Sequence, residues 1–292
     1  MKRDRLLLVV AVVAVSWSAP LIRLARDVPP LAISFWRNFS IALVLAPFVL
    51  IRHRDEIKRS DSKDFAALSM TGLMLAVHFA TWVASVNMTS VASSVLLVAS
   101  TPVFVAIGSF FIGDRPARRV VIGIAIAVVG GSLVTGGDLG AGSRSMAGDG
   151  LAIAGAIAAT GYLIMGRRLR TRYSVLTYAM MVYGSCSIFL AGAMVLTHTS
   201  FLSYRARDWF LLALMAIGPQ LLGHTIFNLL LERIDATRIA VAVMGEPVIS
   251  ALIAALVFGE LPGVLVIPGG VLLLAGIGLS LSKADVALVG LD

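Results

Sequence analysis

Strongly polar and ionisable side chains interrupt several long apolar stretches of this sequence. Glu246, Arg37, His78 and His224 each lie within a run of mostly aliphatic residues. Such a side chain costs about 2.5–3.5 kcal/mol at the centre of a lipid bilayer on insertion scales, so it usually faces a bundle interior or a water-filled cavity. These four residues are therefore candidates for binding a polar solute, transferring a proton or joining helices.

The two histidines recur in one spacing. His78 precedes Trp82 by four residues, and His224 precedes Asn228 by four residues. Residues four apart share one face of a helix, so each pair points in one direction. Because the pair recurs, we favour an interpretation in which both pairs line a cavity. The alternative is that each histidine forms a hydrogen bond to a neighbouring helix.

Glu246 and Arg37 are the charged residues deepest in the apolar runs. Pro247 follows Glu246, removes a backbone donor and can kink a helix. Glu246 could exchange a proton, pair with a substrate ammonium group or join helices, and we favour the last role. Arg37, in the run Trp36-Arg37-Asn38, could pair with a substrate carboxylate. We favour snorkelling of Arg37 towards the outer surface.

Trp17 lies beside Ser16, Ser18 and Pro20, a neighbourhood too polar for a lipid-facing stripe. We interpret it as a cavity aromatic rather than a lipid-facing one. Motifs for other chemistry are absent: the sequence has no GxxxxGK[ST] loop, no HExxH and no CxxC-type cluster. We therefore expect no ATP hydrolysis on this chain, no metal site and no cofactor.

The elements that position these residues must be membrane-spanning helices. The chain has 292 residues, of which 59% are hydrophobic and 14% charged, whereas a soluble domain is about half apolar and about a quarter charged. A helix needs roughly 20 apolar residues to cross the hydrocarbon layer. We predict an all-α membrane protein with ten transmembrane helices. The predicted spans are approximately 6–24, 31–51, 65–88, 90–112, 118–136, 148–166, 173–197, 209–231, 237–258 and 262–282.

The cations set the predicted orientation. With the N-terminus in the cytoplasm, ten spans place 18 of the 24 Lys and Arg residues in cytoplasmic segments and five in outer segments. An excess of Lys and Arg in cytoplasmic loops is typical of membrane proteins, so we predict that both termini are cytoplasmic. The net charge of +8 is thereby explained by topology, and we expect no nucleic-acid partner.

An internal repeat appears when the sequence is shifted by 145–146 residues. FFIGDRP at 110–116 falls on LVFGELP at 256–262, Gly123 and Gly130 fall on Gly269 and Gly276, and Thr101-Pro102 falls on Glu246-Pro247. Residues 1–140 and 145–292 therefore form two predicted five-helix halves, with Pro102 and Pro247 as a pair of hinges.

Because five is an odd number of helices, the second half must be inverted relative to the first. Inverted halves can exchange conformations around a site near the bilayer midplane. This organisation favours a transporter over a receptor, an anchor or an enzyme.

With these motifs, the chain resembles the drug/metabolite transporter superfamily, EamA type. The resemblance is carried by EPVISALIAALVFGELP (246–262) and TPVFVAIGSFFIGDRP (101–116). It implies ten helices, cytoplasmic termini and outward transport of small metabolites around a central cavity. Trp17, His78, Phe79 and Trp82 make the chain most similar to bacterial inner-membrane exporters of aromatic and other amino acids, and this similarity implies a multi-pass protein of that membrane.

Three functions follow, in order of preference. The first is a secondary exporter of amino acids with broad specificity, working as a single chain without an ATPase subunit. The second is the same fold carrying another metabolite or an organic cation; phosphorylated cargo is disfavoured because Arg37 is the only base inside a span. The third is an intramembrane hydrolase using a serine and a histidine. The predicted substrate-binding residues are Trp17, Arg37, Asn38, His78, Phe79, Trp82, His224, Asn228 and Glu246.

Overall fold

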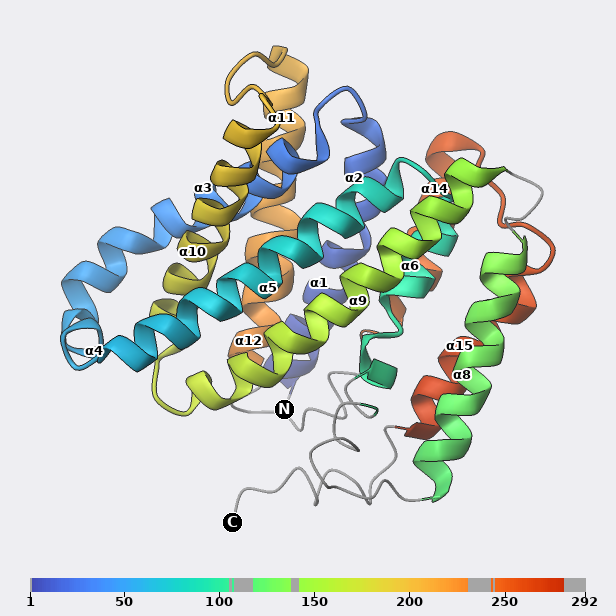
Figure 1. The fold of residues 1–292 in the computed structure, drawn as a ribbon, viewed down its shortest axis with the longest axis horizontal. Coiled ribbons are helices and arrows are strands. Elements are labelled where there is room, and N and C mark those ends of the chain that lie inside the picture. The colour runs from blue at the N-terminus through green and yellow to red at the C-terminus, as the bar shows by residue number, and fades with distance from the viewer. Residues whose placement is uncertain are drawn as a thin grey trace.

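The computed structural model describes residues 2–104, 107, 118–137, 142–230, 243 and 245–280, and every regular element in these residues is a helix (Figure 1). The all-helical prediction is confirmed for this part of the chain. In these described residues, six helices are long and apolar enough to cross a membrane, and three shorter apolar helices accompany them. The six are Leu6–Leu24, Pro30–Arg52, Ser62–Val86, Ser143–Arg170, Val175–Leu196 and Ala206–Leu230; the three are Val91–Phe104, Gly245–Phe258 and Val266–Leu279.

Within the described residues the helices follow the predicted spans, whereas parts of the spans 90–112 and 237–258 lie outside these residues. In the first half they are α1 (Lys2–Ser16), α2 (Ser18–Leu24), α3 (Pro30–Arg52), α4 (Arg54–Lys58), α5 (Ser62–Val86), α6 (Val91–Val98) and α8 (Arg118–Gly137). In the second half they are α9 (Ser143–Arg170), α10 (Val175–Leu196), α11 (Ala206–Met215), η2 (Ala216–Thr225), α12 (Ile226–Leu230), α14 (Gly245–Phe258) and α15 (Val266–Ser280).

Local sequence explains where several helices begin. Pro30 is the first residue of α3, where its missing N–H costs nothing. Ser90 and Ser174 precede α6 and α10, and their hydroxyls accept hydrogen bonds from the amides of Ser93 and Thr177. The predicted break between the spans 65–88 and 90–112 is confirmed, because α5 ends at Val86 and α6 begins at Val91.

Among the described residues, interruptions of regular α-helix occur in three predicted spans. The first breaks at Trp17, the fourth has a turn after Val98, and the eighth contains a ten-residue π-helix around Pro219. Prolines explain the first two breaks, since each frees a carbonyl four residues earlier. The Ser16 carbonyl accepts from the Ser250 hydroxyl at 2.8 Å, and the Val98 carbonyl accepts from the Thr101 hydroxyl at 2.8 Å. Side chains thus satisfy the carbonyls that lipid could not.

Helices α8 and α15 pack side by side at one end of the molecule (Figure 1). A Cβ atom added at Gly269 would lie 2.8 Å from the Gly130 carbonyl, and one added at Gly276 would lie 2.5 Å from the Gly123 carbonyl. Small residues permit this close approach. In the repeat, Gly123 corresponds to Gly269 and Gly130 corresponds to Gly276. Gly123 therefore contacts the counterpart of Gly130, and Gly130 contacts the counterpart of Gly123. An antiparallel pair related by a two-fold axis requires this exchange.

The remaining helices follow the same pairing. Helix α3 packs on its counterpart α10, and α6 packs on α14, which belongs to the corresponding predicted span. The contact of α5 with α9 corresponds to that of η2 with α1. One corresponding pair of positions differs: a Cβ at Gly72 would lie 2.5 Å from the Ser185 Cβ, whereas a Cβ at Gly218, its counterpart at a shift of 146, would meet nothing within 4 Å. The α5–α10 interface is therefore tight at a point where the corresponding part of η2 has free space.

Apolar side chains cover the surface of the bundle and polar side chains lie inside it, as a lipid environment requires. Large aliphatic side chains are exposed on the surface, including Leu256 (86%) and Val264 (87%). In contrast, Arg37, Asn38 and Gln220 are fully buried. The bundle thus presents apolar side chains outwards and encloses polar ones, as expected for a membrane-spanning bundle.

Candidate functional site

The buried polar residues converge on Arg37 of α3. The Arg37 Nε donates to the Gln220 Oε1 at 3.0 Å, and its Nη1 donates to the Ser18 hydroxyl at 3.1 Å. Gln220 in turn donates from Nε2 to the Asn38 Oδ1 at 3.3 Å, and the Asn38 Nδ2 donates to the Ser34 carbonyl at 2.9 Å. Helices α2, α3 and η2 are joined by this network. Snorkelling of Arg37 to the surface is therefore wrong, because its partners hold it inside the bundle.

Two rings of α5 cover the Arg37 guanidinium. Its Cζ atom lies 4.3 Å from the centre of the Phe79 ring and 6.0 Å from that of Trp82. Phe79 and Trp82 are both buried, at 0% and 4% exposure. A cation over an aromatic face is attracted by about 0.5–2 kcal/mol, more when it is desolvated. The predicted residues Arg37, Phe79 and Trp82 are therefore brought together.

His78 combines a packing role with a place beside these rings. Its ring stacks on Trp82, with centroids 5.9 Å apart. Its Nδ1 lies 2.9 Å from the Gly155 carbonyl of α9. Because a carbonyl only accepts, Nδ1 carries the hydrogen. A hydrogen bond to a neighbouring helix, which was the alternative to cavity lining, is thus observed for His78.

His224 and Asn228 approach the site from η2 and α12. His224 meets the Phe79 ring edge to face, with centroids 6.0 Å apart. Asn228 interacts with Tyr162 of α9, which also interacts with Tyr178. A π-helix has a longer turn than an α-helix, so residues spaced by four no longer lie directly above one another. His224 therefore contacts α5, whereas Asn228 contacts α9.

Glu246, Trp17 and the two prolines occupy different places. Glu246 is partly buried in the first turn of α14 and lies within electrostatic range of Arg37. Trp17 is 40% exposed, and its neighbour Ser18 is the residue that contacts Arg37. Pro102 follows the turn at the end of α6, and Pro247 is buried in the first turn of α14. Roles for Trp17 and Glu246 in binding, and for the prolines as hinges, stay predictions.

The unmet hydrogen-bonding capacity of Arg37 suggests what this site can bind. A guanidinium has five N–H donors, and Gln220 and Ser18 account for two of them. The Arg37 Nη2 is buried without a hydrogen-bond partner among the residues that the structure describes. A buried cation without a paired anion costs several kcal/mol. The Nη1–Nη2 edge matches the two oxygens of a carboxylate, so the site is suited to an anionic group.

One end of the bundle, predicted to face outwards, is joined by aromatic packing. The Trp36 Nε1 donates to the Phe201 carbonyl at 2.9 Å, and its ring lies against Trp209 with centroids 4.8 Å apart. Phe35 packs on both Trp36 and Phe201. The start of α3 is thereby packed against, and hydrogen-bonded to, the segment that leads into α11.

A polar clasp joins three further elements at this end. We define it as Arg23 of α2, Glu260 after α14, and the turn Thr89–Val91 between α5 and α6. The Arg23 Nη1 lies 3.6 Å from the Glu260 Oε2, and its Nη2 donates to the Thr89 carbonyl at 2.6 Å. The Glu260 Oε1 accepts from the Val91 amide at 2.6 Å. This carboxylate therefore caps the start of α6, where a negative charge is favourable.

The opposite end carries a second carboxylate cap. The Glu56 Oε2 accepts from the Ser174 amide at 2.8 Å, at the start of α10, and its Oε1 lies 2.9 Å from the His53 Nδ1. Partial burial by itself raises the pKa of Glu56. The hydrogen bonds from Ser174, Thr177 and His53 outweigh it, so the pKa lies below its ordinary value of 4.5.

Together, the all-helical bundle, its apolar surface and its buried polar residues define a polytopic membrane protein. A family model described as the EamA-like transporter family matches residues 5–136 and again 146–282. The chain belongs to the EamA-like transporter family, and the predicted resemblance is confirmed. No curated protein matches it. A solved structure described only as the crystal structure of a protein shares the fold, with a TM-score of 0.68, 17% identity and coverage of 96% of each chain.

Several site residues escaped sequence reasoning. Gln220 and Ser18 bind Arg37 directly, and Tyr183 of α10 lies against Gln220 and Thr225. Gln220 could have been found as a polar residue beside Pro219 within an apolar run. Ser18 and Tyr183 carry no comparable signal, because serine and tyrosine are ordinary in transmembrane helices and only the packing brings them to Arg37.

Proposed function

We propose that this protein is a secondary transporter that exports amino acids of broad specificity across the bacterial inner membrane. The membership of a transporter family supports transport of a small molecule, and the buried Arg37 supports the substrate class. Its Nη1–Nη2 edge holds the carboxylate, and Phe79 and Trp82 accommodate varied apolar side chains without a strict shape. Glu246, within electrostatic range of Arg37, is the proposed partner of the ammonium group.

Alternating access between the two halves moves the site from one side to the other. The exchanged glycine contacts of α8 and α15 support inverted halves that move about a shared axis. Ten helices, cytoplasmic termini and hinges at Pro102 and Pro247 complete the proposed mechanism. We propose that a single chain suffices, without an ATPase subunit. Transport is uncoupled or occurs by exchange, because Glu246 is the one carboxylate predicted deep within a span.

The test is exchange of labelled amino acids by purified protein in liposomes. We expect flux for a broad panel of amino acids and little flux for the matching amines that lack the carboxylate. Arg37→Lys keeps the charge but loses the planar fork of donors. Since a hydrogen bond to a charged group contributes about 1.5–3 kcal/mol, we expect the variant to bind amino acids roughly 10- to 100-fold more weakly.

Arg207→Lys is the matched control, because Arg207 is exposed at the start of α11. It should transport as the unchanged protein does. Equal flux of amino acids and their amines would contradict the role of Arg37 and would favour organic cations as cargo. A failure of the whole amino-acid panel would contradict the proposed substrate.

A further inference from the structure

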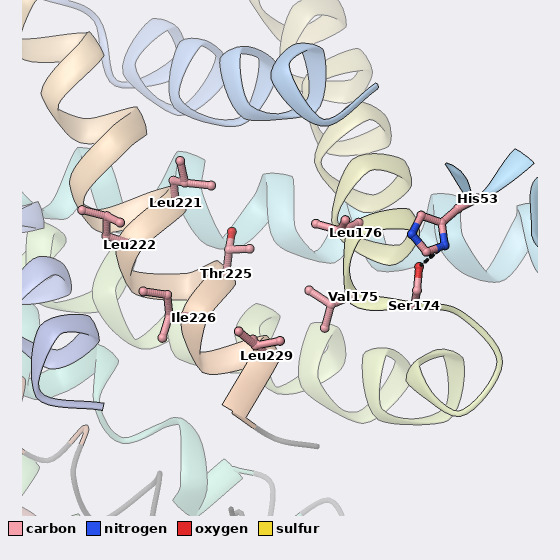
Figure 2. A pocket seen from close by; sticks show the side chains of 9 residues that line it. All are labelled: His53, Ser174, Val175, Leu176, Leu221, Leu222, Thr225, Ile226 and Leu229. Carbon is pink, nitrogen blue, oxygen red and sulfur yellow. Dashed lines mark hydrogen bonds between the residues drawn. The ribbon is translucent and has the colours of Figure 1, made fainter. Parts of the chain in front are cut away.

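An apolar crevice opens between the start of α10 and the η2–α12 segment (Figure 2). It has a volume of about 450 Å³, within the range of roughly 300–1,000 Å³ that small-molecule sites have. Aliphatic side chains from the two elements face each other across it, and polar groups are few. Its lining residues are His53, Ser174, Val175, Leu176, Leu221, Leu222, Thr225, Ile226 and Leu229.

The crevice lies at the end of the bundle predicted to be cytoplasmic. His53 at its edge is preceded by Arg52 and followed by Arg54, in the charged stretch between α3 and α5. Ser174, also at its edge, precedes α10 and lies 3.4 Å from the His53 Nδ1 through its hydroxyl. The crevice therefore has polar residues, His53 and Ser174, at its predicted cytoplasmic edge and aliphatic residues further in.

Thr225 connects the crevice with the Arg37 site. It lines the crevice, and its hydroxyl donates to the Gln220 carbonyl at 3.1 Å. Tyr183 of α10 lies against both Thr225 and Gln220. Gln220 binds Arg37 through its side chain. Thr225 of η2 therefore borders the crevice and contacts Gln220, the residue that binds the guanidinium.

The opposite end of the bundle offers a contrast. There the start of α3, the repeat counterpart of the start of α10, carries the aromatic cluster of Phe35 and Trp36 packed on Phe201. The clasp of Arg23 and Glu260 joins further elements at that end. Contacts therefore fill the outer end where the crevice leaves space at the inner end.

We infer that the crevice is the cytoplasmic portal through which a substrate with an apolar side chain reaches Arg37. The inference rests on the proposed function for the identity of the substrate. Apolar walls accommodate the side chain of an amphipathic amino acid, while the polar groups at His53, Ser174 and Thr225 meet its charged end in succession.

Cysteine accessibility tests the portal. The only native cysteine, Cys186, is removed by Cys186→Ala, and Thr225→Cys is introduced at the inner end of the crevice. Leu214→Cys, at a 37% exposed position on α11 that does not line the crevice, is the matched control. A charged, membrane-impermeant thiosulfonate is added from either side of oriented vesicles. Thiolates form in water rather than in lipid, so Thr225→Cys should react from the cytoplasmic side about tenfold faster than the control.

Transport distinguishes a portal from a lipid-filled groove. Modification of Thr225→Cys should abolish amino-acid flux, and saturating substrate should slow the modification. Reaction only with a lipophilic reagent, at the rate of Leu214→Cys, would show that a lipid acyl chain occupies the crevice and would overturn the inference. Modification that leaves flux unchanged would also overturn it.

A replacement variant guards against misfolding, and the accessibility readout keeps this test separate from the test of function. If Thr225→Cys does not fold, Leu229→Cys, which also lines the crevice, replaces it. If the unmodified protein carries no amino acid, the proposed function fails. The side from which the cysteine reacts still decides whether the crevice opens to the cytoplasm.

Discussion

Replacing Glu260 by glutamine should release the clasp at the outer end of the bundle. The substitution keeps an oxygen that can accept from the Val91 amide but removes the charge that faces Arg23 and the start of α6. The two side chains are only 26% and 23% exposed, so solvent screens their attraction incompletely. The change therefore acts on two electrostatic contacts of one carboxylate.

The magnitude follows from these two contacts. A surface ion pair contributes about 0.2–1 kcal/mol, and a carboxylate at a helix N-terminus about 0.3–1 kcal/mol. Their loss sums to about 0.5–2 kcal/mol, which corresponds to a roughly 2- to 30-fold change in an equilibrium constant. If the clasp forms only when the outer end is closed, Glu260→Gln shifts the population towards the outward-open state by this factor.

A buried reporter measures the shift. Ala254 on α14 is 1% exposed, and its carbonyl accepts from the Glu260 amide at 3.4 Å. In the Cys186→Ala background, Ala254→Cys should react with an impermeant maleimide from the outside 2- to 30-fold faster when Glu260→Gln is also present, as the estimate above requires.

The matched control is Glu56→Gln, which removes the carboxylate cap at the other end of the bundle. It should leave the outside reactivity of Ala254→Cys unchanged. An unchanged rate with Glu260→Gln would refute the role of the clasp in closing the outer end. An equal acceleration by both variants would refute it too, because general loosening would then explain the result.

Three further predictions follow from the packing and the charges. Gly72→Ala should destabilise the protein by about 1–3 kcal/mol and lower its melting temperature in detergent, because the new Cβ would lie 2.5 Å from that of Ser185. Gly218→Ala is the control and should melt as the unchanged protein does, since its Cβ would meet nothing within 4 Å. Equal melting temperatures of the two variants would contradict the tight interface. The lowered pKa of Glu56 means that its stabilisation is complete above about pH 4.5 and is lost as the pH falls through the folded-state pKa. Glu56→Gln should therefore lower the melting temperature at pH 7 but have little effect once the pH is below the folded-state pKa, and a difference that stays constant as the pH falls would count against it. If Glu246 couples protons to transport, Glu246→Gln should abolish the response of flux to an imposed pH gradient, whereas an unchanged response would leave Glu246 a structural role.

Much of the fold could be predicted from the sequence, because span length and hydropathy are local properties. The breaks near 88–90 and at Gly259–Pro262 coincide with the ends of helices in the structure. The spaced glycines at 123, 130, 269 and 276 indicated a repeat, and the structure shows them in exchanged contact. The breaks at Trp17 and Val98 were harder to predict, since a proline can be absorbed within a helix when neighbouring groups satisfy the freed carbonyl.

The candidate site was predictable by residue type but not by arrangement. The cost of a polar group in lipid identified Arg37, Glu246 and both histidines from the sequence alone. Only the tertiary structure decided that Arg37 turns inwards to Ser18 and Gln220, because helix rotation depends on all the packed neighbours of a helix. The sequence determined which residues must avoid lipid, and the packing of the helices decided which of them meet.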